Sequence, residues 1–295
     1  MILPKVQHNE KLESLASLDI GDRVFNAPLG GYSSWQIGGP ADLLVEPTTP
    51  EQVATVVRYV RQHALPLIVI GQGTNLLFAD EGLRGVVLKI GNNMASYSID
   101  GQRIVAEAGL WVPQLARQAM RAGLAGLEHI IGIPGTLGGL VLMNGGSQRK
   151  GIGENVVRVT VVDREGELVR MTREECQFSY RHSALQQAGA VIVEVELECP
   201  AGDIRKIRQT MVADLRERRR KFPRKLPNCG SVFLSTSEMH ATVGPPGKII
   251  EDAGLKGTRI GQAEVSRQHA NFIINLGGAT ADDVLNLIDR IRQTV

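Results

Sequence analysis

Gly132-Ile133-Pro134-Gly135-Thr136-Leu137-Gly138-Gly139 decides the fold together with an earlier stretch, Gly71-Gln72-Gly73-Thr74-Asn75. Glycine lets the backbone approach a ligand closely and turn several N–H groups toward one point, so both stretches suit an anion. The earlier stretch alone is equally well explained as a tight structural turn. The later one has five glycines or prolines in eight positions, too many for an ordinary connection. Together they predict a dinucleotide between two α/β units, with its pyrophosphate held from both sides.

The earlier stretch does not fit a Rossmann dinucleotide fold. Leu76 stands where the third glycine of that fingerprint would be, and no long helical pattern follows it. Glycine is nevertheless frequent throughout the chain, at 33 of 295 residues, or about 11% against a usual share of about 7%. We therefore interpret both stretches as backbone-lined loops of a different α/β arrangement.

An α/β pattern surrounds the earlier loop. Thr49 and Pro50 are the expected cap and first residue of a helix, and the valines between 53 and 60 recur at helical spacing. Residues 65–70 predict a short buried strand, and residues 86–88 predict another strand beyond the loop. This unit extends over about residues 25–89.

Two further units follow. Trp111-Val112-Pro113 starts a predicted helix, and strands are expected at 156–162, 167–171 and 190–197. A helical pattern runs from Asp203 to Lys221, and Thr280 with Asp283 predicts a capped last helix. The predicted domains are therefore residues 1–90, 91–202 and 203–295.

Composition excludes several classes of protein. Lys and Arg number 33 against 31 Asp and Glu, a net charge of +2, which argues against a nucleic-acid partner. The basic run from residue 216 to 225 contains one aromatic residue, Phe222, and is read as a mainly solvated face. No apolar run reaches the length of a membrane span, and no signal peptide is evident. Three cysteines without metal-ligand spacing predict no metal site and a reducing, cytoplasmic location.

Six motifs in fixed order resemble those of the UDP-N-acetylenolpyruvoylglucosamine reductase (MurB) family, over about residues 26–295. They are Ile37-Gly38-Gly39-Pro40-Ala41-Asp42; Gly71-Gln72-Gly73-Thr74-Asn75-Leu76-Leu77; residues 132–139 with Met143-Asn144; Tyr180-Arg181-His182-Ser183; Gly230-Ser231-Val232-Phe233; and His269-Ala270-Asn271-Phe272. The short distance between the last two motifs is similar to the type II form of the family.

This resemblance implies an α+β fold. Residues 1–90 and 91–202 would form the two FAD-binding subdomains of the vanillyl-alcohol-oxidase (PCMH) type, and residues 203–295 an α/β substrate-binding domain. The implied enzyme is a monomeric, cytoplasmic oxidoreductase with non-covalent FAD. It would use NADPH to reduce UDP-N-acetylglucosamine enolpyruvate to UDP-N-acetylmuramate in peptidoglycan synthesis, and so serve cell-wall biogenesis, cell shape and cell division.

The resemblance also implies roles for individual residues. Arg181 would stabilise the negative charge that develops on the substrate, and Ser231 would donate a proton to C2. Tyr180 and Lys221 would bind substrate, with Lys221 near its phosphates. The residues expected to bind FAD are Gly71, Gln72, Gly73, Thr74, Asn75, Leu76, Gly132, Ile133, Pro134, Gly135, Thr136, Gly138, Gly139, Met143, Asn144 and Gly145.

The sequence departs from the family pattern at three places. Leu234-Ser235-Thr236-Ser237 replaces the usual residues after Phe233, and Gly145-Gly146-Ser147 follows Met143-Asn144. A C-terminal strand carrying a Leu-Glu pair, expected after the last helix, is not found before Val295, and we expect it to have been lost by truncation. Two alternatives therefore stay open: a flavin oxidase of the same fold acting on another alcohol or sugar, and a homologue that binds flavin or UDP-sugar with impaired catalysis.

Overall fold

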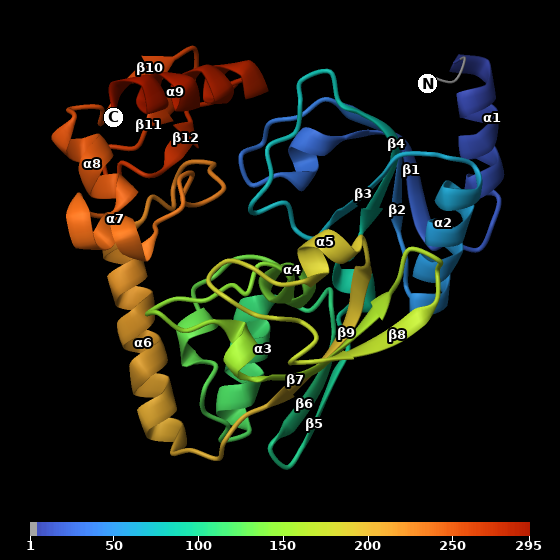
Figure 1. Cartoon of the computed structure of the whole chain (residues 1–295), viewed down its shortest axis with the longest axis horizontal. Helices are drawn as coiled ribbons and strands as arrows, with labels where there is room; N and C mark the ends of the chain where they lie inside the picture. Colours follow the sequence, from blue (N-terminus) through green and yellow to red (C-terminus); the bar gives the residue numbers. More distant parts are fainter. Residues whose placement is uncertain (1–4) are drawn as a thin grey trace. The chain divides into compact units, whose positions relative to one another are not determined.

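The computed structural model describes residues 5–295, and Figure 1 labels its helices and strands. The α-helices are α1 (Lys5–Ala16), α2 (Pro50–Gln62), α3 (Val112–Arg121), α4 (Leu137–Leu142), α5 (Leu185–Ala188), α6 (Ile204–Lys221), α7 (Ser237–Thr242), α8 (Pro246–Asp252) and α9 (Ala281–Thr294). The strands are β1 (Asp22–Pro28), β2 (Pro40–Glu46), β3 (Leu67–Ile70), β4 (Leu83–Lys89), β5 (Tyr97–Asp100), β6 (Arg103–Glu107), β7 (Val156–Val162), β8 (Leu168–Thr172), β9 (Val191–Glu198), β10 (Arg259–Ile260), β11 (Ala263–Val265) and β12 (Ile273–Asn275).

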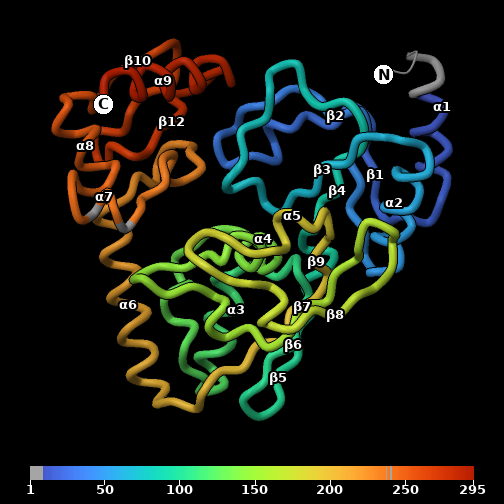
Figure 2. Tube along the Cα trace, in the orientation of Figure 1, coloured from blue at the N-terminus to red at the C-terminus, as the bar shows by residue number. Residues whose placement is uncertain are grey.

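The chain folds into two compact units, each made of separate stretches of sequence. Unit 1 contains the described residues up to Ala27, together with Asp42–Gly71 and Arg84–Arg216. Unit 2 contains Pro28–Ala41, Gln72–Leu83 and Glu217–Val295. The colours of Figure 2 allow each stretch to be followed along the chain. The limits of these units differ from the predicted boundaries at residues 90 and 202, and the three-domain division stays a prediction.

The first sheet of unit 1 has the strand order β1-β2-β4-β3. Helix α2 begins as predicted, because Thr49 Oγ1 accepts a hydrogen bond from the Gln52 N–H at 3.3 Å and its valine face is buried. The prediction of a buried strand at 65–70 is wrong in part. Ile68 and Val69 are 37% and 41% exposed. β3 pairs only with β4, at the edge of the sheet, so its outer side lacks a covering strand.

The second sheet of unit 1 is antiparallel, with the order β5-β6-β9-β7-β8. β7 has its predicted limits, and β8 begins at Leu168, one residue later than predicted. β9, predicted at 190–197, lies between β6 and β7, and Val191, Ile192 and Val193 are all buried. The edge strand β5 has no clear signal in the sequence because it is short and mostly exposed.

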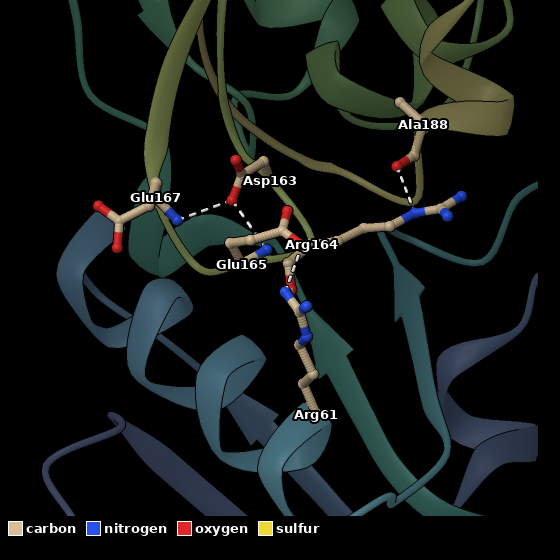
Figure 3. A network of polar contacts seen from close by, with 6 residues as sticks. All are labelled: Arg61, Asp163, Arg164, Glu165, Glu167 and Ala188. Atoms are coloured by element: carbon tan, nitrogen blue, oxygen red, sulfur yellow. Dashed lines mark hydrogen bonds and ion pairs between the residues drawn. The ribbon is translucent and has the colours of Figure 1, made fainter.

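The turn between β7 and β8 is fixed by charged side chains (Figure 3). Asp163 Oδ1 accepts hydrogen bonds from the N–H groups of Glu165 at 2.9 Å and Glu167 at 2.8 Å. Arg61 of α2 forms an ion pair with Glu165, and Arg164 Nε donates to the Ala188 carbonyl at 2.7 Å. The turn is therefore bonded both to α2 and to the end of α5. Separately, one hydrophobic core runs through both sheets of unit 1.

Unit 2 is built around a small antiparallel sheet of order β10-β11-β12, against which α9 packs. Its core also includes Trp35 and Ile37 from an early part of the chain. The predicted capping box of α9 is confirmed, with Thr280 Oγ1 accepting from the Asp283 N–H at 3.0 Å. The sequence pattern did not predict α7, which lies in the segment that departs from the family pattern.

Helix α6 (Ile204–Lys221) begins one residue after the predicted start and ends as predicted, and it passes without interruption through the limit between the units at Arg216. Of its apolar residues, Ile207 and Met211 are buried, whereas Ile204 is 48% exposed at the first turn. Within residues 5–295, no helix combines the length and the hydropathy needed to cross a bilayer.

The turn network gives a prediction for stability. Asp163→Ala removes two hydrogen bonds to backbone N–H groups and should lower the free energy of unfolding by about 1–2 kcal/mol. Glu165→Ala breaks an ion pair between exposed side chains and should cost less than about 1 kcal/mol. Urea denaturation followed by circular dichroism measures both. Equal losses would show that the Asp163 hydrogen bonds do not stabilise the turn.

Candidate functional site

The predicted site residues are shared between the two units, and each set is described within its own unit. Unit 1 carries Gly71, the second glycine loop (residues 132–139), residues 143–145 and the pair Tyr180-Arg181. Unit 2 carries the remainder of the first glycine loop (residues 72–76), Lys221 and Ser231.

The second half of the second glycine loop is the start of a helix, which corrects the prediction of a continuous open loop. Thr136 is the N-cap of α4, and its Oγ1 accepts from the Gly139 N–H at 3.4 Å. The N–H groups of Leu137 and Gly138 donate to the carbonyls of Leu110 and Ala108 at 2.8 and 2.7 Å. These amides are therefore used by the fold. The local cause is Thr136, whose side chain favours the first turn of a helix over further loop.

The middle of the second glycine loop, at Gly135 and Thr136, keeps amides that a ligand can use. The N–H groups of Gly135 and Thr136 have no hydrogen-bond partner among residues 5–295, although both residues are buried. Buried amides are almost always paired, so this pair favours a bound polar group. Gly135 has φ +129°, a backbone conformation that other residues rarely adopt.

The two glycine loops approach each other within unit 1. A Cβ atom added to Gly71 would lie 2.4 Å from Thr136 Oγ1, so glycine is required at this position for the close approach. The N–H of Gly71 also has no partner in the described part of the chain. Gly71 and residues 135–136 therefore present three unpaired amides close to one another, which suits an anion.

In the part of the first glycine loop that belongs to unit 2, two carbonyls are bound, whereas two amides of the described structure are free. The Gly73 carbonyl accepts from the Ser34 N–H at 3.1 Å, and the Leu76 carbonyl accepts from Ser33 Oγ at 3.3 Å. In the same described region, the N–H groups of Gln72 and Gly73 have no partner. Gly73 has φ +59°, and a Cβ there would lie 1.8 Å from the Tyr32 carbonyl oxygen. This arrangement leaves the two amides available to a ligand.

Tyr180 and Arg181 form the tip of a tight turn in unit 1, which is part of the yellow trace in Figure 2. Ser179 and His182 close the turn by exchanging two backbone hydrogen bonds of 3.0 and 3.1 Å. Arg181 has φ +55°, and Tyr180 is 66% exposed. The Arg181 guanidinium lies 5.7 Å from the Tyr180 ring centroid. A cation and an aromatic ring are thus presented together.

Asn144 anchors this turn. Its Nδ2 donates to the Ser179 carbonyl at 2.8 Å, and its Oδ1 accepts from the Gly153 N–H at 2.9 Å. Arg181 Nη2 donates to the Gly146 carbonyl at 3.3 Å. The sequence assigned Asn144 to the cofactor, and that role stays a prediction. The sequence analysis did not predict its contact with the turn that carries Arg181, because no local pattern relates residue 144 to residue 179.

Ser231 follows a second tight turn, in unit 2. Gly230 has φ +83°, and its N–H donates to Asn228 Oδ1 at 3.1 Å. Cys229 is buried, and its Sγ donates to the carbonyls of Gly73 and Leu76 at 3.4 and 3.3 Å. Burial raises the pKa of the Cys229 thiol, so it stays a neutral donor. Ser231 itself is exposed and available to a substrate.

Lys221 lies at the exposed end of α6, beside an aromatic group made of Phe222, His269 and Phe272. The ring centroids of His269 and Phe272 lie 5.3 and 5.1 Å from that of Phe222. Burial lowers the pKa of His269, and the charges of Lys221 and Lys256 lower it further. The carboxylate of Glu251 opposes this effect, and it forms an ion pair with Lys256 at 2.6 Å. Lys221 is therefore the residue of this surface that would meet an anionic group such as phosphate.

Known proteins resemble this chain over most of its length. Residues 41–172 match an FAD binding domain, and residues 222–295 match the C-terminal domain of UDP-N-acetylenolpyruvoylglucosamine reductase. UDP-N-acetylenolpyruvoylglucosamine reductase 1 of Corynebacterium glutamicum is 47% identical over 263 residues, which is 89% of this chain and 78% of the relative. The reductase of Heliobacterium modesticaldum is 45% identical over 281 residues, or 93% and 86% of the two chains.

Solved structures extend the comparison to the fold. The crystal structure of UDP-N-acetylenolpyruvylglucosamine reductase (MurB) from Thermus caldophilus aligns with a TM-score of 0.80 at 33% identity, over 93% of this chain and 95% of that chain. Phl p 4, a grass pollen allergen with glucose dehydrogenase activity, aligns with a TM-score of 0.52 at 16% identity, over 66% of this chain and 44% of the allergen, and shares the fold alone. The predicted fold class and resemblance are confirmed: the chain belongs to the UDP-N-acetylenolpyruvoylglucosamine reductase family.

Proposed function

We propose that this chain is an FAD-dependent enzyme that uses NADPH to reduce UDP-N-acetylglucosamine enolpyruvate to UDP-N-acetylmuramate, in the synthesis of peptidoglycan precursors. The observation that carries this function is the set of unpaired backbone amides in both glycine loops, in a chain whose relatives carry this reductase name. The monomeric state and cytoplasmic location expected from the sequence stay predictions.

The residues of the two loops fit the cofactor. A dinucleotide diphosphate needs several N–H donors and close approach of the backbone, and residues 71–73 and 135–136 supply both. Bound FAD would supply the hydride chemistry between NADPH and the substrate. The chain would hold the diphosphate through these amides, and the remaining predicted cofactor residues would line the rest of the site.

Arg181 is assigned to charge stabilisation. Reduction of the enolpyruvyl double bond places negative charge on C2 and its carboxylate, and a guanidinium binds such a carboxylate through two parallel hydrogen bonds. The tight turn limits the backbone freedom of Arg181, and Asn144 ties the turn to unit 1. A preorganised cation loses little entropy when the charge develops, which is what this step requires.

Ser231 is assigned to proton donation at C2. A hydroxyl is a weak acid, so its contribution depends on being held close to the carbon that takes the proton. Gly230 and Asn228 form the turn that presents it, and Cys229, two residues before Ser231, is buried and bonded to the Gly73 carbonyl. Tyr180 and Lys221 would bind the substrate, with Lys221 near its phosphates.

The flavin oxidase alternative rests on fold likeness at 16% identity, whereas the relatives named as reductases are 36–47% identical. The experiment below also distinguishes the second alternative, a homologue that binds flavin or UDP-sugar with impaired catalysis. An oxidase would consume oxygen in the presence of an alcohol or sugar, and a binding protein would retain reduced flavin after substrate is added.

An anaerobic absorbance experiment tests the function. The flavin bands of the purified chain should bleach with NADPH and return rapidly when UDP-N-acetylglucosamine enolpyruvate is added. Ser231→Ala should keep the bleaching and slow the return by about 100-fold or more. A wild-type flavin that stays bleached would contradict the reductase, and an unchanged rate in Ser231→Ala would remove Ser231 from the mechanism.

The first glycine loop gives a prediction for cofactor retention. Gly73→Ala forces a Cβ against the Tyr32 carbonyl at an unfavourable φ, so we expect FAD to bind at least about tenfold more weakly. Gly31→Ala is the matched control, because a Cβ there meets no atom within 4 Å. Equilibrium titration of the apoprotein with FAD, followed by flavin fluorescence, measures both. Equal affinities for the two variants would count against the loop as part of the cofactor site.

Two arginine variants separate a catalytic cation from a surface cation. Arg181→Met should lower kcat/KM by about 100-fold or more, because the charge on the substrate loses its partner. Arg220→Met should change it by less than about fivefold, as expected for an exposed charge. Steady-state NADPH oxidation compares them. Similar losses in both variants would mean that Arg181 has a structural role.

A further inference from the structure

The motif His269-Ala270-Asn271-Phe272 is part of the family resemblance, but the proposed mechanism gives no role to its asparagine. Asn271 is 6% exposed and lies two residues before β12. A buried amide side chain must find partners for its donor and its acceptor, and these partners show what the residue holds in place.

Within residues 5–295, all the hydrogen bonds that Asn271 makes to another segment go to the residues directly after Ser231. Asn271 Oδ1 accepts from the Phe233 N–H at 2.9 Å, and Nδ2 donates to the Phe233 carbonyl at 2.9 Å. The Asn271 carbonyl accepts from the Val232 N–H, also at 2.9 Å. The amide side chain thus binds both polar groups of one residue, as a neighbouring strand would.

Asn271 is itself held by the sheet of unit 2. Its N–H donates to His269 Nδ1 at 3.2 Å. The carbonyl of the next residue, Phe272, accepts from the Ser266 N–H at 2.8 Å, and Ile273 pairs with Val265 of β11. Asn271 therefore links Phe233 to the sheet of unit 2 and fixes its position relative to that sheet.

Ser231 lies between this anchor and another one. On its N-terminal side, the buried Cys229 is bonded to the carbonyls of residues 73 and 76 in the first glycine loop. On its C-terminal side, Val232 and Phe233 are bonded to Asn271. Ser231 is exposed between them, so its backbone is fixed while its hydroxyl stays accessible.

We propose that Asn271 is a positioning residue for the proton donor Ser231. The inference rests on the proposed function, because it assumes that Ser231 acts at C2. A reacting group must be held within about 0.5 Å of its productive position, and a displacement of about 1 Å can slow a reaction about 100-fold. Asparagine suits the task because its short side chain carries one donor and one acceptor group, whereas an ionised aspartate only accepts.

Two half-reactions measured by anaerobic stopped-flow absorbance test this role. Asn271→Ala should keep the FAD content and the rate of flavin reduction by NADPH. Reoxidation by UDP-N-acetylglucosamine enolpyruvate should slow by about 10- to 100-fold. Asn155→Ala is the matched control, since Asn155 is a buried asparagine of unit 1 whose Nδ2 donates to the Glu198 carbonyl at 3.1 Å. It should leave the ratio of the two rates unchanged.

A double-mutant cycle distinguishes positioning from general stabilisation. If Asn271 acts through the hydroxyl, Asn271→Ala should cause less than about a twofold further loss in a Ser231→Ala background. The same loss in both backgrounds, or equal losses in both half-reactions, would overturn the proposal. If the wild-type chain fails to reoxidise its flavin, or Ser231→Ala reoxidises at the wild-type rate, the proposed function or the role of Ser231 fails instead.

Asn271→Asp provides a second variant that keeps the size of the side chain. The ionised carboxylate accepts from the Phe233 N–H but cannot donate to the Phe233 carbonyl, whereas the protonated acid offers a donor and an acceptor. At neutral pH the reoxidation of this variant should therefore be slower than that of the wild type, because the bond to the Phe233 carbonyl is lost. No loss at all would contradict positioning through the two hydrogen bonds.

Discussion

Unpaired backbone amides are the constraint on which the rest of this structure depends. A fold normally pairs its buried N–H groups, yet the buried residues 73, 135 and 136 leave theirs free while neighbouring carbonyls are bound. The half-buried residues 71 and 72 also leave theirs free. This requires a backbone that bends sharply and packs without side chains. Gly71 approaches Thr136 and Gly73 approaches Tyr32 so closely that no Cβ fits at either glycine. The free amides of both loops therefore depend on a backbone conformation that glycine allows.

The two side chains assigned to the reaction are presented in similar ways. Arg181 sits at the tip of a two-residue turn and has a positive φ, and Ser231 follows Gly230, whose φ is also positive. In each case a buried or half-buried asparagine from a distant segment, Asn144 or Asn271, binds the backbone beside the reactive residue. Tight turns expose a side chain, and the asparagines restrict its movement. Accessibility and precision are thus supplied by different residues.

The sequence predicted what depends on neighbouring residues. The caps of α2 and α9 and the limits of β7 were confirmed because Thr49, Thr280 and a run of valines act locally. The exposure of β3 depends on its place at the edge of a sheet, and the start of α4 within the second glycine loop could be predicted only by giving Thr136 more weight than the glycines. Family motifs identified Arg181 and Ser231 as candidates. The contacts of Asn144, Cys229 and Asn271 join distant segments, which no local pattern reveals.

The discontinuous make-up of unit 2 has a consequence for the order of folding during synthesis. Cys229 reaches the Gly73 carbonyl across 156 positions of sequence, and Asp80 accepts from the Ala281 N–H, at the start of α9, across 201. The first glycine loop therefore emerges from the ribosome long before its partners exist. Contacts of such high sequence separation form slowly, because a large loop must close first. The first glycine loop and the segment after it therefore complete these contacts only once residues 229 and 281 have been synthesised.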